Sequence, residues 1–367
     1  MLLLEQLASA CGVSGAEEEV RRIIMEDLQQ EGIVGTVDAL GNLLIDGFSV
    51  KAEDNHEAEQ SELPRVLLAA HMDEVGLMIT SVEDDGFIRF KTVGGIDERV
   101  LLSKTVLVGK QKIPGVIGSK AVHLQKPEER KKNVEVDQLY IDIGCSGKEE
   151  AQKKVKPGDY AAFNSPLQEA GEKIYKGKAM DDRVGCAILA DLLKNREMPP
   201  FLSAFTVQEE AGLRGAQVAG YTMKPDFALI LETTSASDVP GSEEHEQVST
   251  LGGGPVLSIM DATVVVDSKM LEVLTGLARE NGIPFQFRSF TGGGTDAGAI
   301  SLSRRGVRSA VVSVPARYIH SPCSVVNKED IYHTQKLVEY FLRVVEKKGF
   351  ALFESWENPS SQGGASL

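Results

Sequence analysis

The sequence predicts an α/β protein in which a helix-flanked mixed sheet is interrupted by a small β-rich insertion. Residues 66–70 form a continuous apolar run ahead of His71, which is typical of a strand buried on both faces. Strand and helix patterns alternate on either side of a central stretch of short β-like runs between glycine-rich and charged turns. We therefore predict one domain from residues 1–73 and 166–355, an inserted β-rich domain over 74–165, and a disordered tail over 356–367.

In the first part of the chain, one helix and one strand precede the buried run. Ser14-Gly-Ala-Glu17 has the spacing of a capping box, and apolar residues recur after it at helical intervals through Leu28. Residues 42–46 form a short apolar run that predicts a strand. Residues 51–62 are acidic and polar without periodicity, so we expect an exposed loop there.

The same patterns predict the strands and helices of the insertion and of the second part of the chain. Strand-like runs in the insertion lie at residues 77–80, 87–90, 105–108, 112–118 and 138–142. After residue 166, helices are expected from Asp182, near Gly215, over 268–280 and over 328–347, and strands over 202–207, 226–231 and 309–314. Such alternation predicts a sheet with helices packed on it.

The composition is that of a globular protein with more than one structural unit. The chain has 367 residues, more than one hydrophobic core usually supports, and 42% of them are hydrophobic. A net charge of −15 argues against a nucleic-acid partner, because such partners select a basic surface. No apolar run reaches the ~20 residues of a membrane helix, and the first residues lack the basic region of a signal peptide. The four cysteines are isolated, which fits reduced thiols in a cytoplasmic protein.

Residues able to bind metal recur where the predicted strands end. The carboxyl ends of strands in an open α/β sheet line a common crevice, so these side chains are expected to converge. Two imidazoles with several carboxylates suit Zn²⁺, Co²⁺ or Mn²⁺. The residues are His71, Glu209, Glu210, Glu232 and His320, joined by Asp181 where a turn meets a helix.

Each of these residues, taken alone, has a simpler explanation. A histidine after a strand is more often a satisfied core residue, and Asp181 or Asp182 could cap a helix. Glu209 and Glu210 could form a solvated pair. Two adjacent carboxylates delivered into a crevice are costly unless they are paired or coordinated, so their co-occurrence with the histidines favours a metal site.

Neighbouring residues are expected to divide the roles. Alternation along an extended chain puts His71 and Asp73 on the same side, so Asp73 should accept the outer ring N–H of His71 and fix its tautomer. The side chains of Glu209 and Glu210 diverge, so one is expected to bind metal while the other faces water and substrate.

Five segments of the chain carry a resemblance to a known family. They are Ala69-Ala-His71-Met-Asp73-Glu-Val-Gly, Lys178-Ala-Met-Asp181-Asp182-Arg-Val-Gly, Val207-Gln-Glu209-Glu210-Ala-Gly-Leu-Arg-Gly-Ala, Gly292-Gly-Gly-Thr-Asp296-Ala-Gly and Arg317-Tyr-Ile-His320-Ser. The chain resembles the tetrahedral (TET) aminopeptidases, which use two metal ions and are also labelled glutamyl or deblocking aminopeptidases or endoglucanases. The resemblance covers nearly the whole chain.

This resemblance implies a site and an assembly. It implies that two divalent ions, most often Zn²⁺, are held by His71, Asp181, Glu210, Glu232 and His320, with Asp181 bridging, and that Glu209 is the general base. It also implies a zinc-peptidase-like catalytic domain, an inserted dimerisation domain, and dimers that assemble into a dodecamer. Many family members have Asp where this chain has Glu232, a difference that bears on metal affinity.

The predicted function is a metal-dependent aminopeptidase acting on peptides with a free N-terminus. Glu209 would activate a water bound to both metals. Two alternatives remain, a glycoside hydrolase acting on glucans and a catalytically inactive assembly subunit. One tryptophan and 6% aromatic residues provide few sugar-stacking surfaces. No Gly-x-Ser-x-Gly elbow supports a serine hydrolase. Acidic and aliphatic N-terminal residues both remain open as the preferred substrate.

Two further features are a glycine-rich loop and a histidine of the insertion. The loop from Gly292 to Gly298, with Asp296 placed to cap a helix, either lines the substrate site or forms a structural turn. His123 lies in the insertion and is expected to be structural.

Overall fold

The structure, a computed structural model, describes residues 2–54, 63–243 and 247–353. They form an eleven-stranded mixed sheet and a closed antiparallel barrel beside it. The sheet order is β1 (Thr36–Val37), β2 (Leu43–Asp46), β12 (Leu202–Thr206), β3 (Val66–His71), β13 (Phe227–Ser235), β16 (Arg308–Arg317), β17 (Ser324–Asn327), β11 (Ile174–Gly177) and β10 (Gln168–Glu169), with β14 (Val256–Leu257) and β15 (Gln286–Phe287) attached beside β16. The predicted fold class is confirmed.

The centre of the sheet is parallel and buried. β3 pairs in parallel with β12 on one side and with β13 on the other, and β13 pairs in parallel with β16. All six residues of β3 are buried, as its continuous apolar run predicts. Because these four strands run in the same direction, their carboxyl ends lie along one edge of the sheet.

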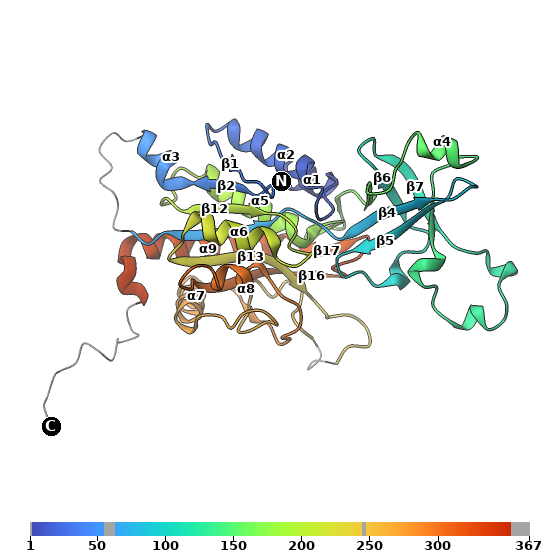
Figure 1. The fold of residues 1–367 in the computed structure, drawn as a ribbon. Coiled ribbons are helices and arrows are strands. Elements are labelled where there is room, and N and C mark those ends of the chain that lie inside the picture. The colour runs from blue at the N-terminus through green and yellow to red at the C-terminus, as the bar shows by residue number, and fades with distance from the viewer. Residues whose placement is uncertain (1, 55–62, 244–246, 354–367) are drawn as a thin grey trace, which may run out of the picture.

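Helices cover both faces of this sheet (Figure 1). α5 (Met180–Lys194) packs on β3 and β13 and contacts α1 (Leu2–Ser9) and α2 (Glu18–Gln29), while α8 (Asp296–Ser301) packs on β13 and β16. The remaining helices are α3 (Gly47–Asp54), α4 (Lys148–Gln152), α6 (Arg214–Met223), α7 (Ser268–Glu280) and α9 (Lys328–Lys348). Among the residues that the structure describes, no helix is both long and apolar enough to span a membrane.

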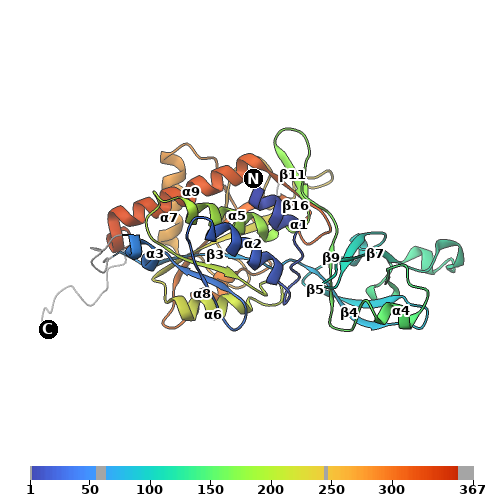
Figure 2. The ribbon, with the colours of Figure 1, turned by 90° about the horizontal axis from the view of Figure 1, so that it is seen from above.

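The barrel lies beyond one end of the sheet (Figure 2). It has a hydrophobic core of its own, which includes Leu77, Phe90 and Ile141 and is separate from the core around the sheet. Its strands follow the order β4 (Gly76–Val82), β5 (Ile88–Val93), β8 (Tyr140–Asp142), β7 (Ile113–Gly118), β6 (Thr105–Val108) and β9 (Tyr160–Phe163).

Two local predictions for the first part of the chain are wrong. Ser14 and Glu17 do not form a capping box, because the Ser14 hydroxyl donates to Oδ2 of Asp73 at 2.5 Å and the Glu17 carboxylate makes no capping bond to α2 within the described chain. Residues 51–54, expected in a loop, belong to helix α3. The rest of that loop and the predicted tail lie outside the described residues.

Candidate active site

The predicted metal-binding residues come together at the carboxyl edge of the four parallel strands. β3 ends at His71, which lies opposite Thr206 of β12. The other residues arrive from the chain after β12, from β13, from the loop after β16 and from the first turn of α5. They are Glu209 and Glu210, Glu232, His320 and Asp181, in that order.

Asp181 stands between two groups of potential metal ligands. Its Oδ1 lies 3.2 Å from Nε2 of His71, which is 3.3 Å from Oε1 of Glu232. Its Oδ2 lies 3.3 Å from Nε2 of His320, which is 3.1 Å from Oε1 of Glu210. Within each group the ligand atoms lie within 4.8 Å of one another. Each group therefore has three potential ligand atoms close enough together to bind one ion, and Asp181 belongs to both groups.

The site holds more buried acid than positive charge. Burial raises the pKa of Glu232 to about 7, with Asp181 adding to the shift and His71 opposing it. Burial also raises the pKa of Glu209 well above its usual value. Oε2 of Glu232, a residue only 6% exposed, has no hydrogen-bond partner among the described residues. A buried, unpartnered carboxylate oxygen on a residue that lies beside the His71 imidazole fits a divalent cation of the Zn²⁺ type.

Asp73 contacts more than the ring of His71. Nδ1 of His71 lies 3.1 Å from the carbonyl oxygen of Asp73 and 3.4 Å from its carboxylate. The same carboxylate accepts the backbone N–H of Glu209 at 2.9 Å and that of Glu210 at 3.1 Å. Sequence reasoning missed this second role, because a bond between segments more than 130 residues apart leaves no local pattern.

His320 is oriented by the segment that follows β5. Its Nδ1 lies 3.0 Å from the carbonyl oxygen of Gly95, which leaves Nε2 facing Asp181 and Glu210. A partner on the outer ring nitrogen fixes the tautomer and direction of a ligating imidazole. A backbone carbonyl has no residue-type signature, so no sequence signal identified Gly95.

The site opens into a cavity of about 690 Å³. Its lining includes Glu209 and, from the glycine-rich loop, Gly292 to Gly294. Arg288 is the one lysine or arginine among the described lining residues. Its Nη2 donates to the carbonyl of Gly292 at 2.7 Å, and its buried Nε has no partner in the described part of the chain. Sequence reasoning did not single out Arg288.

Three other residues discussed from the sequence belong to neither group of potential metal ligands. Asp296 does not cap α8 as predicted; its buried Oδ2 accepts the Thr206 hydroxyl at 2.5 Å, and burial raises its pKa to about 6. Asp182 does accept a helical amide, that of Gly185 at 3.1 Å. His123 is exposed in a short 3₁₀ turn of the insertion.

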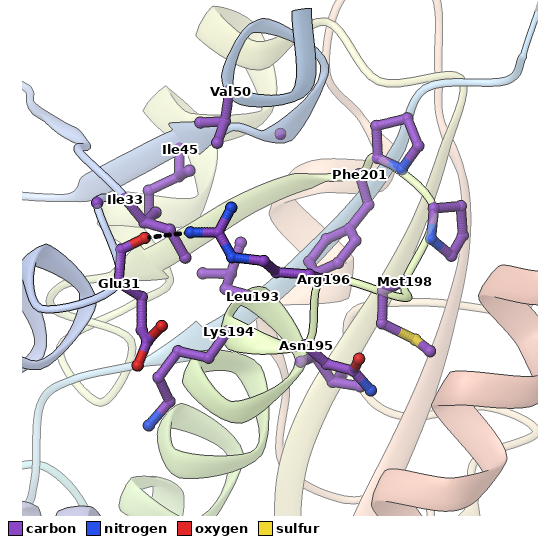
Figure 3. A pocket seen from close by; sticks show the side chains of 15 residues that line it. Glu31, Ile33, Ile45, Val50, Leu193, Lys194, Asn195, Arg196, Met198 and Phe201 are labelled. Carbon is purple, nitrogen blue, oxygen red and sulfur yellow. Dashed lines mark hydrogen bonds between the residues drawn. The ribbon is translucent and has the colours of Figure 1, made fainter. Parts of the chain in front are cut away.

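A second cavity, of about 310 Å³, lies at the opposite end of the sheet, between the end of α5 and the start of β12 (Figure 3). Ile33, Leu193 and Phe201 form its apolar side, and the Arg196 guanidinium donates to the carbonyl of Glu31 at 2.9 Å. None of the predicted site residues lines it. The candidate chemistry of the chain is therefore concentrated in the first cavity.

A mixed α/β sheet with a cavity of histidines and carboxylates at its carboxyl edge fits the class of metal-dependent hydrolases. Residues 55–337 match the M42 glutamyl aminopeptidase family, and the chain belongs to that family. It is a metal-dependent aminopeptidase, as its sequence predicts.

Individual relatives agree with this family. The glutamyl aminopeptidase of Lactococcus lactis is 31% identical over 93% of this chain and 94% of its own length. The structure of an aminopeptidase from the archaeon Desulfurococcus kamchatkensis is 34% identical, with a TM-score of 0.88 over 98% of both chains. The TET1 peptidase of Pyrococcus horikoshii, described as assembling into a tetrahedron or a large octahedral shell, is 31% identical, with a TM-score of 0.79 over 93% of this chain and 98% of that one. The resemblance to TET aminopeptidases is confirmed, and neither alternative function is better supported.

Proposed function

We propose that the protein removes N-terminal residues from peptides in this cavity. It would use two divalent ions that have Asp181 as a shared ligand. His71, Asp181 and Glu232 would hold one ion, and Asp181, Glu210 and His320 the other. The observation that carries this proposal is that the two oxygens of Asp181 face two separate groups of donors. The nitrogen and carboxylate donors suit Zn²⁺, with Co²⁺ or Mn²⁺ as alternatives.

Glu209 is the proposed general base. It lines the cavity beside Glu210 and belongs to neither group of donors among the described residues, so its carboxylate is left for proton transfer. When bound, the metal pair supplies Lewis acidity that makes water acidic near neutral pH and polarises the peptide carbonyl. Glu209 accepts the proton of the attacking water and returns it to the leaving amine.

The acidic lining favours a substrate with a free amino terminus. Asp181, Glu209, Glu210 and Glu232 all face the cavity. Two bound divalent ions would offset the charges of Asp181, Glu210 and Glu232, which leaves Glu209 to attract a protonated α-amino group; an acetylated terminus carries no charge to be attracted. The same lining therefore supports exopeptidase rather than endopeptidase action.

Hydrolysis of aminoacyl anilides tests the proposed function. The purified protein is assayed on free and N-acetylated substrates, before chelation, after chelation, and with Zn²⁺, Co²⁺ or Mn²⁺ restored. We expect cleavage of the free-amine substrates only, lost on chelation and regained with metal. Cleavage that survives complete removal of metal, or equal cleavage of the acetylated substrates, would refute the proposal.

We also propose that acidic N-terminal residues are preferred. Arg288 is the one lysine or arginine among the described residues that line the cavity, and a guanidinium matches the planar, two-oxygen geometry of a carboxylate. Because the Gly292 carbonyl already fixes Nη2 of Arg288, the remaining donors are held in place before substrate arrives. Arg288 would therefore bind the side-chain carboxylate of an N-terminal Glu or Asp.

Arg288→Met tests this preference, with the leucyl anilide as an internal control. Loss of a charged hydrogen bond of about 1.5–3 kcal/mol predicts a ~10- to 100-fold lower kcat/KM for glutamyl anilide, with leucyl anilide changed by less than about threefold. An equal loss on both substrates would assign Arg288 a structural role instead.

The insertion, residues 74–165, is the proposed dimerisation domain, and residues 1–73 with 166–355 the catalytic domain. The separate core of the barrel and the tetrahedral assembly of the Pyrococcus horikoshii relative support this division and a dodecamer. Sedimentation should then give twelve times the chain mass of 39.6 kDa, and a stable monomer would contradict it. Cytoplasmic location stays a prediction from the isolated cysteines.

A further inference from the structure

Three consecutive backbone amides at the base of the site are held by two buried carboxylates from elsewhere in the chain. Asp73 accepts the N–H groups of Glu209 and Glu210. Glu17 accepts the N–H of Gln208 through Oε1, at 3.1 Å. Each amide of the 208–210 turn thus has a carboxylate acceptor that belongs neither to β12 nor to the turn itself.

Glu17 is built into this position. It is only 4% exposed, and its Oε1 also accepts the N–H of Gly15 at 2.7 Å. The Ser14 hydroxyl donates to Asp73, so residues 14–17 connect the two acceptors. An acidic residue at the start of a helix usually accepts from that helix's own amides, whereas the Glu17 side chain makes no such bond to α2 within the described chain. Its carboxylate serves the 208–210 turn instead.

Gln208 is the residue that most needs this support. Its φ is +55°, in the left-handed region that residues other than glycine rarely occupy. This conformation turns the chain at the end of β12, directly before Glu209. Strained conformations of this kind persist where surrounding contacts determine them. The bond from the Gln208 N–H to Glu17 is one of those contacts, and it fixes the direction in which Glu209 leaves the sheet.

We infer that Glu17 is a positioning residue for Glu209, holding the Gln208 amide so that the Glu209 carboxylate faces the cavity. The inference rests on the proposed role of Glu209 as the base. Glu17 itself neither lines the described cavity nor belongs to either donor group. Its loss should therefore lower turnover while metal binding and substrate binding are kept.

Four variants of metal-loaded protein test this role. Glu17→Ala removes the acceptor, Glu17→Asp shortens its reach, and Glu17→Gln keeps a carbonyl oxygen in place; Glu18→Ala, at the exposed neighbouring residue, is the control. Small displacements of a catalytic group cost up to ~100-fold, so we expect kcat of Glu17→Ala to fall ~10- to 100-fold with KM within about twofold. Glu17→Gln should stay within about threefold of the unmodified protein, because its amide oxygen accepts both N–H groups. Should Glu17→Ala not fold, Glu17→Asp should show the same loss of kcat at constant KM.

A double variant identifies the group through which Glu17 acts. If Glu17 works by positioning Glu209, then Glu17→Ala should cause no further loss in a Glu209→Gln background. Unchanged kcat in both Glu17→Ala and Glu17→Asp, loss of metal in step with activity, or a Glu17→Gln variant as impaired as Glu17→Ala would each overturn the inference. Failure of the proposed function has a different signature: activity would survive chelation or Glu209→Gln, and the inference would fall with it.

Discussion

Two clusters of charged side chains come from neighbouring positions in the sequence, but their acidic residues are neutralised to different extents. In the Glu74 cluster, the carboxylate of Glu74 lies 2.7 Å from Nζ of Lys178 and 3.2 Å from Nη2 of Arg183, and backbone carbonyls accept the remaining bonds of both cations. In the Asp181 cluster, three acidic residues meet two imidazoles, and one carboxylate oxygen has no partner among the described residues. The members of the Asp181 cluster are the five proposed ligands His71, Asp181, Glu210, Glu232 and His320.

The difference shows where the chain supplies its own cations. Lys178 and Arg183 flank Asp181, and Glu74 follows His71 by three residues. The Glu74 cluster therefore anchors the two segments that carry the His71 and Asp181 side chains. Burying an acid without compensation is costly. The chain neutralises Glu74 with two cations but gives the three acids of the Asp181 cluster only two imidazoles, so the Asp181 cluster has room for positive charge from outside.

The largest expected effect separates chemistry from metal binding within the site. Glu209→Gln should lower kcat by ~10²- to 10⁴-fold, because proton transfer by a positioned carboxylate is worth that much, while both metal ions are retained. Asp181→Asn should lose metal as well as activity, because Asp181 serves both groups of donors. Activity assays with elemental analysis of the same samples check this. Full turnover in Glu209→Gln would rule out Glu209 as the general base.

The next effect tests the Glu74 cluster. Glu74→Ala leaves two buried cations unpaired and should destabilise the fold by about 3–5 kcal/mol in denaturant unfolding. The exposed pair of Lys91 and Asp137 provides a control, since Asp137→Ala should cost less than about 1 kcal/mol. Equal effects of the two substitutions would show that the Glu74 cluster is not an anchor.

A third prediction concerns stabilisation by metal. An ion present at 100 times its Kd stabilises the native state by about 2.7 kcal/mol per site. Thermal unfolding of chelated protein should therefore rise in Tm when Zn²⁺ is restored, and equally so for Glu209→Gln. Asp181→Asn should show little rise. A similar rise in all three proteins would place the bound metal elsewhere.

The smallest expected effect concerns Glu17. Among the described residues, its buried carboxylate accepts hydrogen bonds from backbone amides and has no cation or imidazole as partner. Burial raises its pKa to about 7 against hydrogen bonds from Gly15 and Gln208, compared with 4.5 when unfolded. Between pH 4.5 and 7 the unfolded chain loses this proton while the folded chain keeps it, so stability falls as pH rises through that window. Glu17→Gln does not titrate and should gain about 1–3 kcal/mol relative to the unmodified protein by pH 8, with no gain at pH 4.5. A gain independent of pH would contradict this assignment.

The sequence predicted those parts of the site that depend on local pattern. The run before His71 is continuously apolar, and the strands before Glu209 and around Glu232 are buried and largely apolar; their ends mark where polar side chains emerge. The capping interpretation of Ser14 and Glu17 failed because the spacing is a local signal, and Asp73 and Gln208 compete for the same side chains from far away in the sequence. Asp296 failed similarly, since Thr206 takes its carboxylate.

By itself, the sequence determined the fold class, the order of the longer strands and helices, and which residue types gather at the strand ends, because hydrophobic periodicity and strand direction are properties of short segments. Only the tertiary structure decided that Asp181 faces two groups of potential ligands, that Gly95 orients His320, that Arg288 faces the cavity, and that Glu17 and Asp73 accept the amides of the 208–210 turn. These contacts join distant segments through backbone groups or directed side chains. Their geometry exists only once the chain has folded.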